Sequence, residues 1–221
     1  MENEYLEELY KAQIDNKADY VITLIDVDKV QKTSMNLCRN EYNQLFARFQ
    51  IDRNGYVMGK LYKTKIINDL HLRFMVNVHL GEDSMFALRY LLETKNVVLI
   101  SSDKYFYEKG RSDSLTKKIN SYESELAGKE EFEGIVGQLI NELNLDDLSI
   151  KELEISQRLY IERTLVSIMR LPNQKDRLNK LQGLDLSLYN KYTKPYNWKE
   201  KVLLFLLRKK FFYIYDMILH L

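Results

Sequence analysis

Residues 78–100, VHLGEDSMFALRYLLETKNVVLI, join a helix to a buried strand. After Gly81, apolar side chains recur at helical spacing, and this pattern predicts a helix that opens at Asp83. The apolar residues cover most of its circumference, so we expect the helix to pack against neighbours on several sides. The run NVVLI (96–100) is short and apolar, which predicts a strand buried in a sheet.

Helix and strand patterns also alternate on both sides of this stretch. Residues 1–17 predict an amphipathic helix, and ADYVITLI (18–25) predicts a second buried strand. Closer to the opening stretch, residues 60–70 have the pattern of a short amphipathic helix and residues 72–75 that of a strand. This alternation over residues 1–125 indicates an α/β fold.

From Lys129 onward the sequence has the pattern of helices almost to its end. Residues 130–143 and 149–171 have helical periodicity, whereas residues 186–197 are polar and predict a loop. We therefore expect a mainly helical extension at residues 126–197, after the α/β part of the chain.

The C-terminal segment, WKEKVLLFLLRKKFFYIYDMILHL (198–221), is both basic and apolar. Arg208, Lys209 and Lys210 separate its two apolar stretches, so the segment cannot comfortably cross a bilayer. A basic amphipathic helix with Trp and Phe suits the surface of an anionic membrane. A terminal helix docked on the protein's own core explains the same pattern, and both interpretations stay open.

The composition excludes several classes of protein. The 221 residues include 33 Lys and Arg against 32 Asp and Glu, a net charge of +1 that argues against a nucleic-acid-binding protein. A single cysteine, Cys38, cannot form an intrachain disulfide, which favours a cytoplasmic location. The sequence contains no glycine-rich phosphate loop and no nucleophile elbow, and its three histidines lack metal-ligand spacing.

Two carboxylate pairs are candidates for chemistry. Asp26 and Asp28 form an Asp-x-Asp, which can hold Mg²⁺ or Mn²⁺ against a diphosphate, although a solvated strand end is the simpler interpretation. Glu82 and Asp83 stand at the start of the predicted helix, where an aspartate caps backbone N–H groups and meets the helix dipole. A carboxylate at such a corner can also act as a general base. The two roles of Asp83 are compatible.

Three segments in order resemble a known family: GKLYKTKIINDLHLRF (59–74), the opening stretch, and YFYEKGRSDSLT (105–116). The set resembles the second half of the catalytic domain of family-2 glycosyltransferases, specifically the bacterial enzymes that build capsular and other surface polysaccharides. The resemblance covers roughly residues 1–120 and implies part of a GT-A-like mixed sheet with flanking helices. It implies inverting transfer of a sugar from a nucleotide-sugar donor to a glycan or lipid-linked acceptor.

The resemblance also implies roles for individual residues. Asp83 matches the base that deprotonates the acceptor hydroxyl. Arg111 and Ser114 match a later segment in which a cation could meet the donor phosphate. Met58-Gly59 stands where the family has an aromatic residue. The positions expected to bind substrate are Glu82, Lys60, Tyr62, Arg111 and Ser114.

The start of the chain departs from the family pattern. In the family, a donor-binding half with the metal-binding Asp-x-Asp precedes a helix like that at residues 1–17. We therefore expect this half to be missing, Mg²⁺ or Mn²⁺ to bind only with it, and transfer by this chain alone to be negligible. A partner chain or second copy would cover the exposed sheet edge. The alternative is a non-catalytic binding or assembly protein on the same scaffold, at the inner face of the cell membrane.

Overall fold

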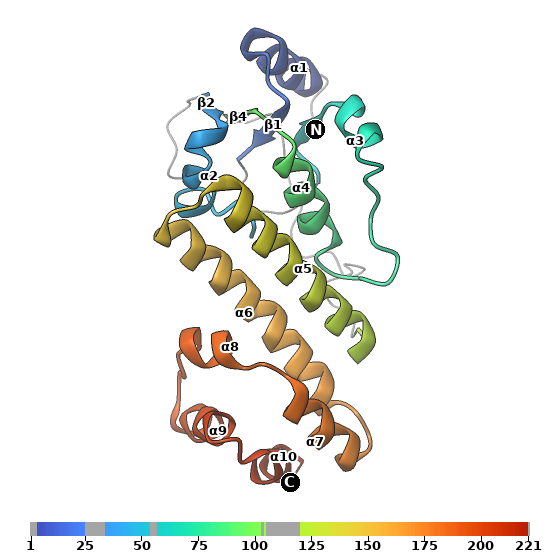
Figure 1. Ribbon diagram of the computed structural model, residues 1–221, viewed down its shortest axis with the longest axis vertical. Coiled ribbons are helices and arrows are strands. Elements are labelled where there is room, and N and C mark those ends of the chain that lie inside the picture. The colour runs from blue at the N-terminus through green and yellow to red at the C-terminus, as the bar shows by residue number, and fades with distance from the viewer. Residues whose placement is uncertain (1–3, 25–33, 54–56, 103, 105–119, 221) are drawn as a thin grey trace.

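The computed structural model describes residues 4–24, 34–53, 57–102, 104 and 120–220. Figure 1 shows a sheet with its flanking helices at one end, a long helical hairpin across the middle, and shorter helices at the other end. This arrangement confirms the predicted class, an α/β fold with a mixed sheet, flanking helices and a helical C-terminal region.

The described residues form a four-stranded mixed sheet in the order β2-β4-β1-β3. Its strands are β1 (Tyr20–Thr23), β2 (Met35–Cys38), β3 (Lys60–Tyr62) and β4 (Asn96–Ile100). At the centre, β1 and β4 pair in parallel, while β3 pairs antiparallel with β1 and β2 pairs antiparallel with β4. The two central strands coincide with the apolar runs in which the sequence predicted buried strands.

The edge strand β3 corrects the prediction of a helix over residues 60–70. This strand pairs with β1, with Tyr62 opposite Tyr20, and the helix that follows it, α3, spans only Thr64–Asp69. Local periodicity could not reveal the pairing, because the partner strand lies far away in the sequence. The strand predicted at residues 72–75 was also wrong, because no strand forms there.

Side chains alternate between the two faces of the sheet, and each face packs on different helices. On one face, Val21 and Val98 pack with Tyr5 and Leu9 of α1 (Tyr5–Asn16). The other face forms the larger core with several further helices. Among them are α2 (Asn43–Ala47), which follows a short 3-10 helix at Arg39–Glu41, α4 (Glu82–Leu92) and α5 (Tyr122–Leu143).

A helical hairpin of α5 and α6 (Asp147–Met169) connects the sheet to the C-terminal region. The turn places Asn144 in the left-handed region at φ 50°, and the Asp146 carboxylate accepts a hydrogen bond of 2.8 Å from the Ser149 N–H. Leu153, early in α6, packs in the core beside the sheet, whereas Ile168 packs in a second core. The hairpin therefore contributes to both hydrophobic cores.

The C-terminal region corrects two predictions. Its helices are α7 (Gln174–Gly183), α8 (Ser187–Tyr192), α9 (Trp198–Arg208) and α10 (Phe212–Leu219). Residues 186–197, predicted as a loop, contain α8. The single tail helix predicted at residues 198–221 is two helices, because the chain turns at Lys210, which has φ 57°.

The tail docks on the rest of the protein through one side of each helix. Leu206 and Leu207 of α9 and Phe212 and Tyr215 of α10 are buried in the second core together with Ile168. None of the helices in the described part of the chain is long and apolar enough to span a membrane. The proposed division at residues 125 and 197 stays a prediction.

Candidate active site

The first turn of α4 is fixed by a glycine that no other residue can replace without strain. Gly81 precedes the helix with φ 97°, a conformation that side chains rarely adopt. A Cβ atom at Gly81 would also overlap the hydroxyl of Tyr160, which comes from α6. The close approach of Tyr160 therefore sets where Glu82 and Asp83 begin the helix.

Asp83 lies at the corner between α4 and the loop that leads into β3. Burial is the largest effect on its carboxyl and raises its pKa, and the neighbouring charge of Glu82 raises it further. The Val57 N–H, which donates a hydrogen bond to the carboxylate, and the charge of Lys60 act in the opposite direction, but the pKa of Asp83 stays raised. The carboxylate is therefore a stronger base than a solvated aspartate.

Lys60 and Tyr62 of β3 lie beside the Asp83 carboxylate. Burial lowers the pKa of Lys60 to about 8, against the opposing attraction of Asp83. Burial likewise raises the pKa of Tyr62, and the negative charge of Asp83 adds to this effect. Lys60 and Tyr62 occupy alternate positions on a strand, so both side chains lie on the face that Asp83 adjoins.

Several aromatic rings pack around Tyr62, next to this corner. The ring of Tyr62 lies 4.9 Å from the rings of both Tyr20 and Tyr90 and 5.7 Å from Phe86. Phe74, whose exposed fraction is 47%, stacks on Phe86 at 4.6 Å. The cluster therefore carries an exposed aromatic ring at Phe74.

Hydrogen bonds fix two tyrosines of the cluster. The Tyr90 hydroxyl donates to the Asp19 carbonyl and accepts from the Lys63 N–H, both at 2.7 Å. The Tyr20 hydroxyl donates to the Tyr62 hydroxyl at 3.2 Å. The sequence analysis missed Tyr20, and only its position opposite Tyr62 in the strand pairing would have revealed it.

The other expected site residues are placed less completely. Glu82 follows Gly81, and its negative charge adds to the larger effect of burial in raising the pKa of Tyr160 on α6. Arg111 and Ser114 fall outside the described residues, as do Asp26 and Asp28. The structure thus brings together Asp83, Lys60 and Tyr62, with Glu82 beside them.

The family resemblance implies a divalent cation, but the described residues do not supply a set of ligands for one. The described residues contain no group of three or more His, Cys, Asp or Glu that could hold a metal ion. We therefore derive no chemical step through a metal here.

The comparisons with known proteins show the fold of the chain. No family model matches the chain, and no curated protein matches it either. Crystal structures of TarS residues 1–349 from S. aureus do match: the complex with UDP-GlcNAc has a TM-score of 0.54 at 15% identity, and the complex with UDP has 0.55 at 14%.

These matches cover 96% of this chain but only 60–62% of the TarS chains. The chain therefore spans about three-fifths of the length of the structures that it matches. At this level of identity the likeness shows the fold alone, which is a glycosyltransferase-like fold.

Proposed function

We propose that this chain provides the acceptor-activating side of an inverting glycosyltransferase of the family-2, GT-A type. The donor is a nucleotide-sugar, and the acceptor is a glycan or a lipid-linked glycan in surface polysaccharide synthesis. The observation that carries the proposal is the position of Asp83 at the N-terminal corner of α4, beside Lys60 and Tyr62. The match to TarS structures with UDP-GlcNAc and UDP supports a UDP-sugar as the donor class.

The chemistry of Asp83 follows from its surroundings. Its carboxylate accepts the proton of an acceptor hydroxyl while the hydroxyl oxygen bonds to the anomeric carbon of the donor sugar. The bond from that carbon to the nucleoside diphosphate breaks in the same step, so the configuration inverts. Burial raises the pKa of Asp83, which makes it a better proton acceptor, and the nearby Lys60 ammonium stabilises the ionised form that must accept the proton.

The proposal is tested by sugar transfer from UDP-GlcNAc, with Mn²⁺ present, to a panel of oligosaccharide and lipid-linked acceptors. Because transfer by this chain alone is expected to be negligible, the deciding assay includes a partner polypeptide, and there we expect Asp83→Asn to lower transfer by roughly 10²–10⁴-fold. The matched control is Asp69→Asn, which changes an exposed carboxylate on α3. To include any partner polypeptide, both substitutions are also made in the gene of the source cell and transfer is measured in its extract. Undiminished transfer by Asp83→Asn would leave this residue only as an acidic side chain in the first turn of α4.

A specific observation favours peripheral binding at a membrane, with or without catalysis. The outward side of α9 carries Trp198, Val202 and Phe205, and the outward side of α10 carries Tyr213 and Ile214. Basic residues flank these apolar side chains: Lys199, Lys201, Arg208, Lys209 and Lys210.

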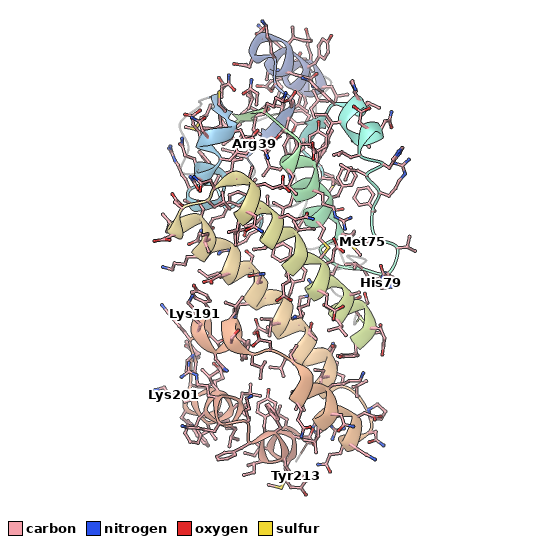
Figure 2. The ribbon with its side chains drawn as sticks, in the orientation of Figure 1. Arg39, Met75, His79, Lys191, Lys201 and Tyr213 are labelled. Atoms are coloured by element: carbon pink, nitrogen blue, oxygen red, sulfur yellow. The ribbon has the colours of Figure 1, made fainter. Side chains whose placement is uncertain are left out.

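Lys201 and Tyr213 extend outward at the end of the molecule far from the sheet (Figure 2). An anionic lipid surface suits this combination of exposed apolar and basic side chains. If no transfer is found in either assay above, the chain is the non-catalytic, membrane-peripheral protein on the same scaffold.

A further inference from the structure

A cavity of about 680 Å³ opens between the N-terminal end of α4 and one face of α6. Gly81 and Ser84 border it, so it adjoins the turn that carries Asp83, but Asp83 is not among the residues that line it. Its polar lining comes from the loop after α2 and from α5 and α6. The residues that matter are Asp52, Arg53, Glu125, Ser156, Tyr160 and Arg163.

One side of the cavity is a continuous face of α6. Ser156, Tyr160 and Arg163 are spaced by four and three residues, so they lie on the same side of the helix. The Arg163 guanidinium lies 5.0 Å from the centroid of the Tyr160 ring, and Phe132 stacks on that ring at 4.3 Å. Because both faces of the ring are covered, a ligand in the cavity would be recognised through hydrogen bonds and not through aromatic stacking.

Three buried polar atoms of the lining have no hydrogen-bond partner among the described residues: Oδ1 of Asp52, a residue that is 4% exposed, Nε of Arg163 and Oε2 of Glu125. The Glu125 oxygen lies in an ion pair with Arg163 at 2.7 Å, which leaves the Asp52 and Arg163 atoms for a ligand. The other carboxylate oxygen of Asp52 accepts a hydrogen bond from the Ser156 hydroxyl, which fixes the side chain at the cavity. A buried polar atom without a partner costs stability. A hydroxyl group of a ligand can donate to one such atom and accept from the other.

The charges of the lining are balanced, which decides between classes of ligand. The lining holds three arginines, Arg53, Arg163 and Arg170, and three carboxylates, Asp52, Glu125 and Glu162. Arg53 pairs with Glu152 and Arg163 pairs with Glu125, each at 2.7 Å, so two of the three guanidinium groups already have carboxylate partners. A phosphate or diphosphate would meet as many carboxylates as arginines in this lining and would gain little. A neutral ligand rich in hydroxyls avoids this repulsion.

We propose that this cavity binds a neutral saccharide unit of the acceptor glycan. The inference rests on the proposed function, because it places an acceptor subsite next to the hydroxyl that Asp83 would activate. The unit donates a hydroxyl hydrogen bond to Asp52 and accepts one from Arg163, while Ser84 and Gly81 form the rim toward Asp83.

The test is saturation-transfer NMR on the full chain with a panel of neutral methyl glycosides, with inorganic phosphate and UDP as charged comparators. We expect at least one glycoside to bind and to lose affinity roughly tenfold in Asp52→Asn. A second variant, Leu159→Trp, fills the cavity from an exposed position of α6 that does not disturb the buried polar groups. Its matched control is Leu148→Trp, which is exposed on the same helix outside the cavity.

Several results would overturn the inference. These are the absence of glycoside binding, binding that survives both Asp52→Asn and Leu159→Trp, or phosphate binding in preference to all glycosides. The proposed function fails separately. Glycoside binding that persists in Asp83→Asn, together with undiminished sugar transfer by Asp83→Asn in the extract of the source cell, would support the saccharide site and refute the base. Sugar transfer that depends on Asp83, without glycoside binding at the cavity, would support the base and refute the saccharide site.

Discussion

Lys60 and Asp83 adjoin each other where β3 meets the first turn of α4, and burial pushes each of them toward its neutral form. The pKa of Lys60 is lowered to about 8 by burial, and the pKa of Asp83 is raised by burial, while the opposite charge of each partner resists both changes. Burial therefore opposes the charged form of each residue, and the opposite charge of its partner favours it. Such tension is typical of functional sites, where a reactive group is kept at a cost to stability.

Replacement of Lys60 by methionine should reveal this cost in the pH dependence of stability. In the unfolded chain a lysine releases its proton near pH ~10.4, whereas Lys60 in the folded chain does so at about 8. Between these values the unfolded state binds more protons, so the free energy of unfolding of the unsubstituted protein rises with pH from about 8. Below that window both states are protonated and the full cost of burying the charge remains.

We therefore expect Lys60→Met to be more stable than the unsubstituted protein at pH 7, by on the order of 1–3 kcal/mol, and the gap to narrow toward pH ~9.5. Urea denaturation at a series of pH values measures it. The measurements stop at pH ~9.5 because tyrosines of the unfolded chain ionise near pH ~10, which lowers the free energy of unfolding and obscures the contribution of Lys60. Lys65→Met, at a side chain that is 81% exposed, should follow the unsubstituted protein. A constant gap at all these pH values would contradict the prediction.

Gly81→Ala tests whether the corner of α4 depends on glycine. The alanine would have to hold φ near 97° and displace the Tyr160 hydroxyl, so we expect a loss of roughly 1–3 kcal/mol in the free energy of unfolding. Gly137→Ala provides the control, because a Cβ atom there meets nothing within 4 Å in the middle of α5. That substitution should stabilise the protein by roughly 0.5–1 kcal/mol. Equal stability of the two variants would show that the corner is not strained.

The sequence predicted the elements whose residues carry their own signal. The apolar runs of β1 and β4 and the periodic residues of α4, α5 and α6 are visible locally, and each forms the predicted type of element. β3 was misassigned because Lys60–Tyr62 becomes a strand only through its pairing with β1. The basic run at residues 208–210 was visible between two apolar stretches, but neither the turn at Lys210 nor the packing of α9 and α10 against α6 and α7 was predicted.

The candidate site also combines residues with a local sequence signal and residues that meet only through packing. Asp83 was predicted as a carboxylate at a helix start, and the family resemblance indicated Lys60 and Tyr62. The requirement for Gly81 could not be predicted, because it comes from Tyr160 on a distant helix. The cavity beside α6 was also invisible in the sequence, since Asp52 and Arg163 meet there only through the packing of the hairpin on α2.

Arg177 and Asp216 form a buried ion pair that should hold the tail in place. The Arg177 guanidinium donates two hydrogen bonds to the Asp216 carboxylate, at 2.5 and 3.0 Å, and Asp216 has an exposed fraction of 0%. Arg177→Leu leaves this carboxylate buried without its cation, so we expect a loss of about 3–5 kcal/mol in the free energy of unfolding. Adding Asp216→Leu to this variant should recover part of the loss.

The same pair should contribute to acid denaturation. The hydrogen bond from Arg177 is the largest effect on Asp216 and lowers its pKa below the ordinary value. The pair therefore contributes its full stability above pH ~4 and loses it as the pH falls through the lowered pKa. The control is Lys191→Leu, which removes a more exposed ion pair with Glu154 and should lower the free energy of unfolding far less. Similar losses for Arg177→Leu and Lys191→Leu would contradict a structural role for the buried pair.

Binding of the tail to anionic lipid is best tested on its exposed face. Removing residues 198–221 would also remove Leu206 and Phe212 from the second core, so a deletion cannot separate binding from folding. Phe205→Glu changes a side chain that is 52% exposed and should preserve the fold. We expect the unsubstituted chain to sediment with vesicles that contain phosphatidylglycerol, to do so less at high salt, and to lose most binding in this variant.

Leu148→Glu, at a position 51% exposed near the start of α6, introduces the same charge far from the tail and should leave vesicle binding unchanged. Vesicles of phosphatidylcholine alone separate the apolar contribution from the electrostatic one. The five basic residues at 199, 201 and 208–210 are attracted only to anionic lipid, so binding to the neutral vesicles should be weaker than binding to the anionic ones. Equal binding to neutral and anionic vesicles, or full binding by Phe205→Glu, would leave the exposed face of α9 without a role at the membrane.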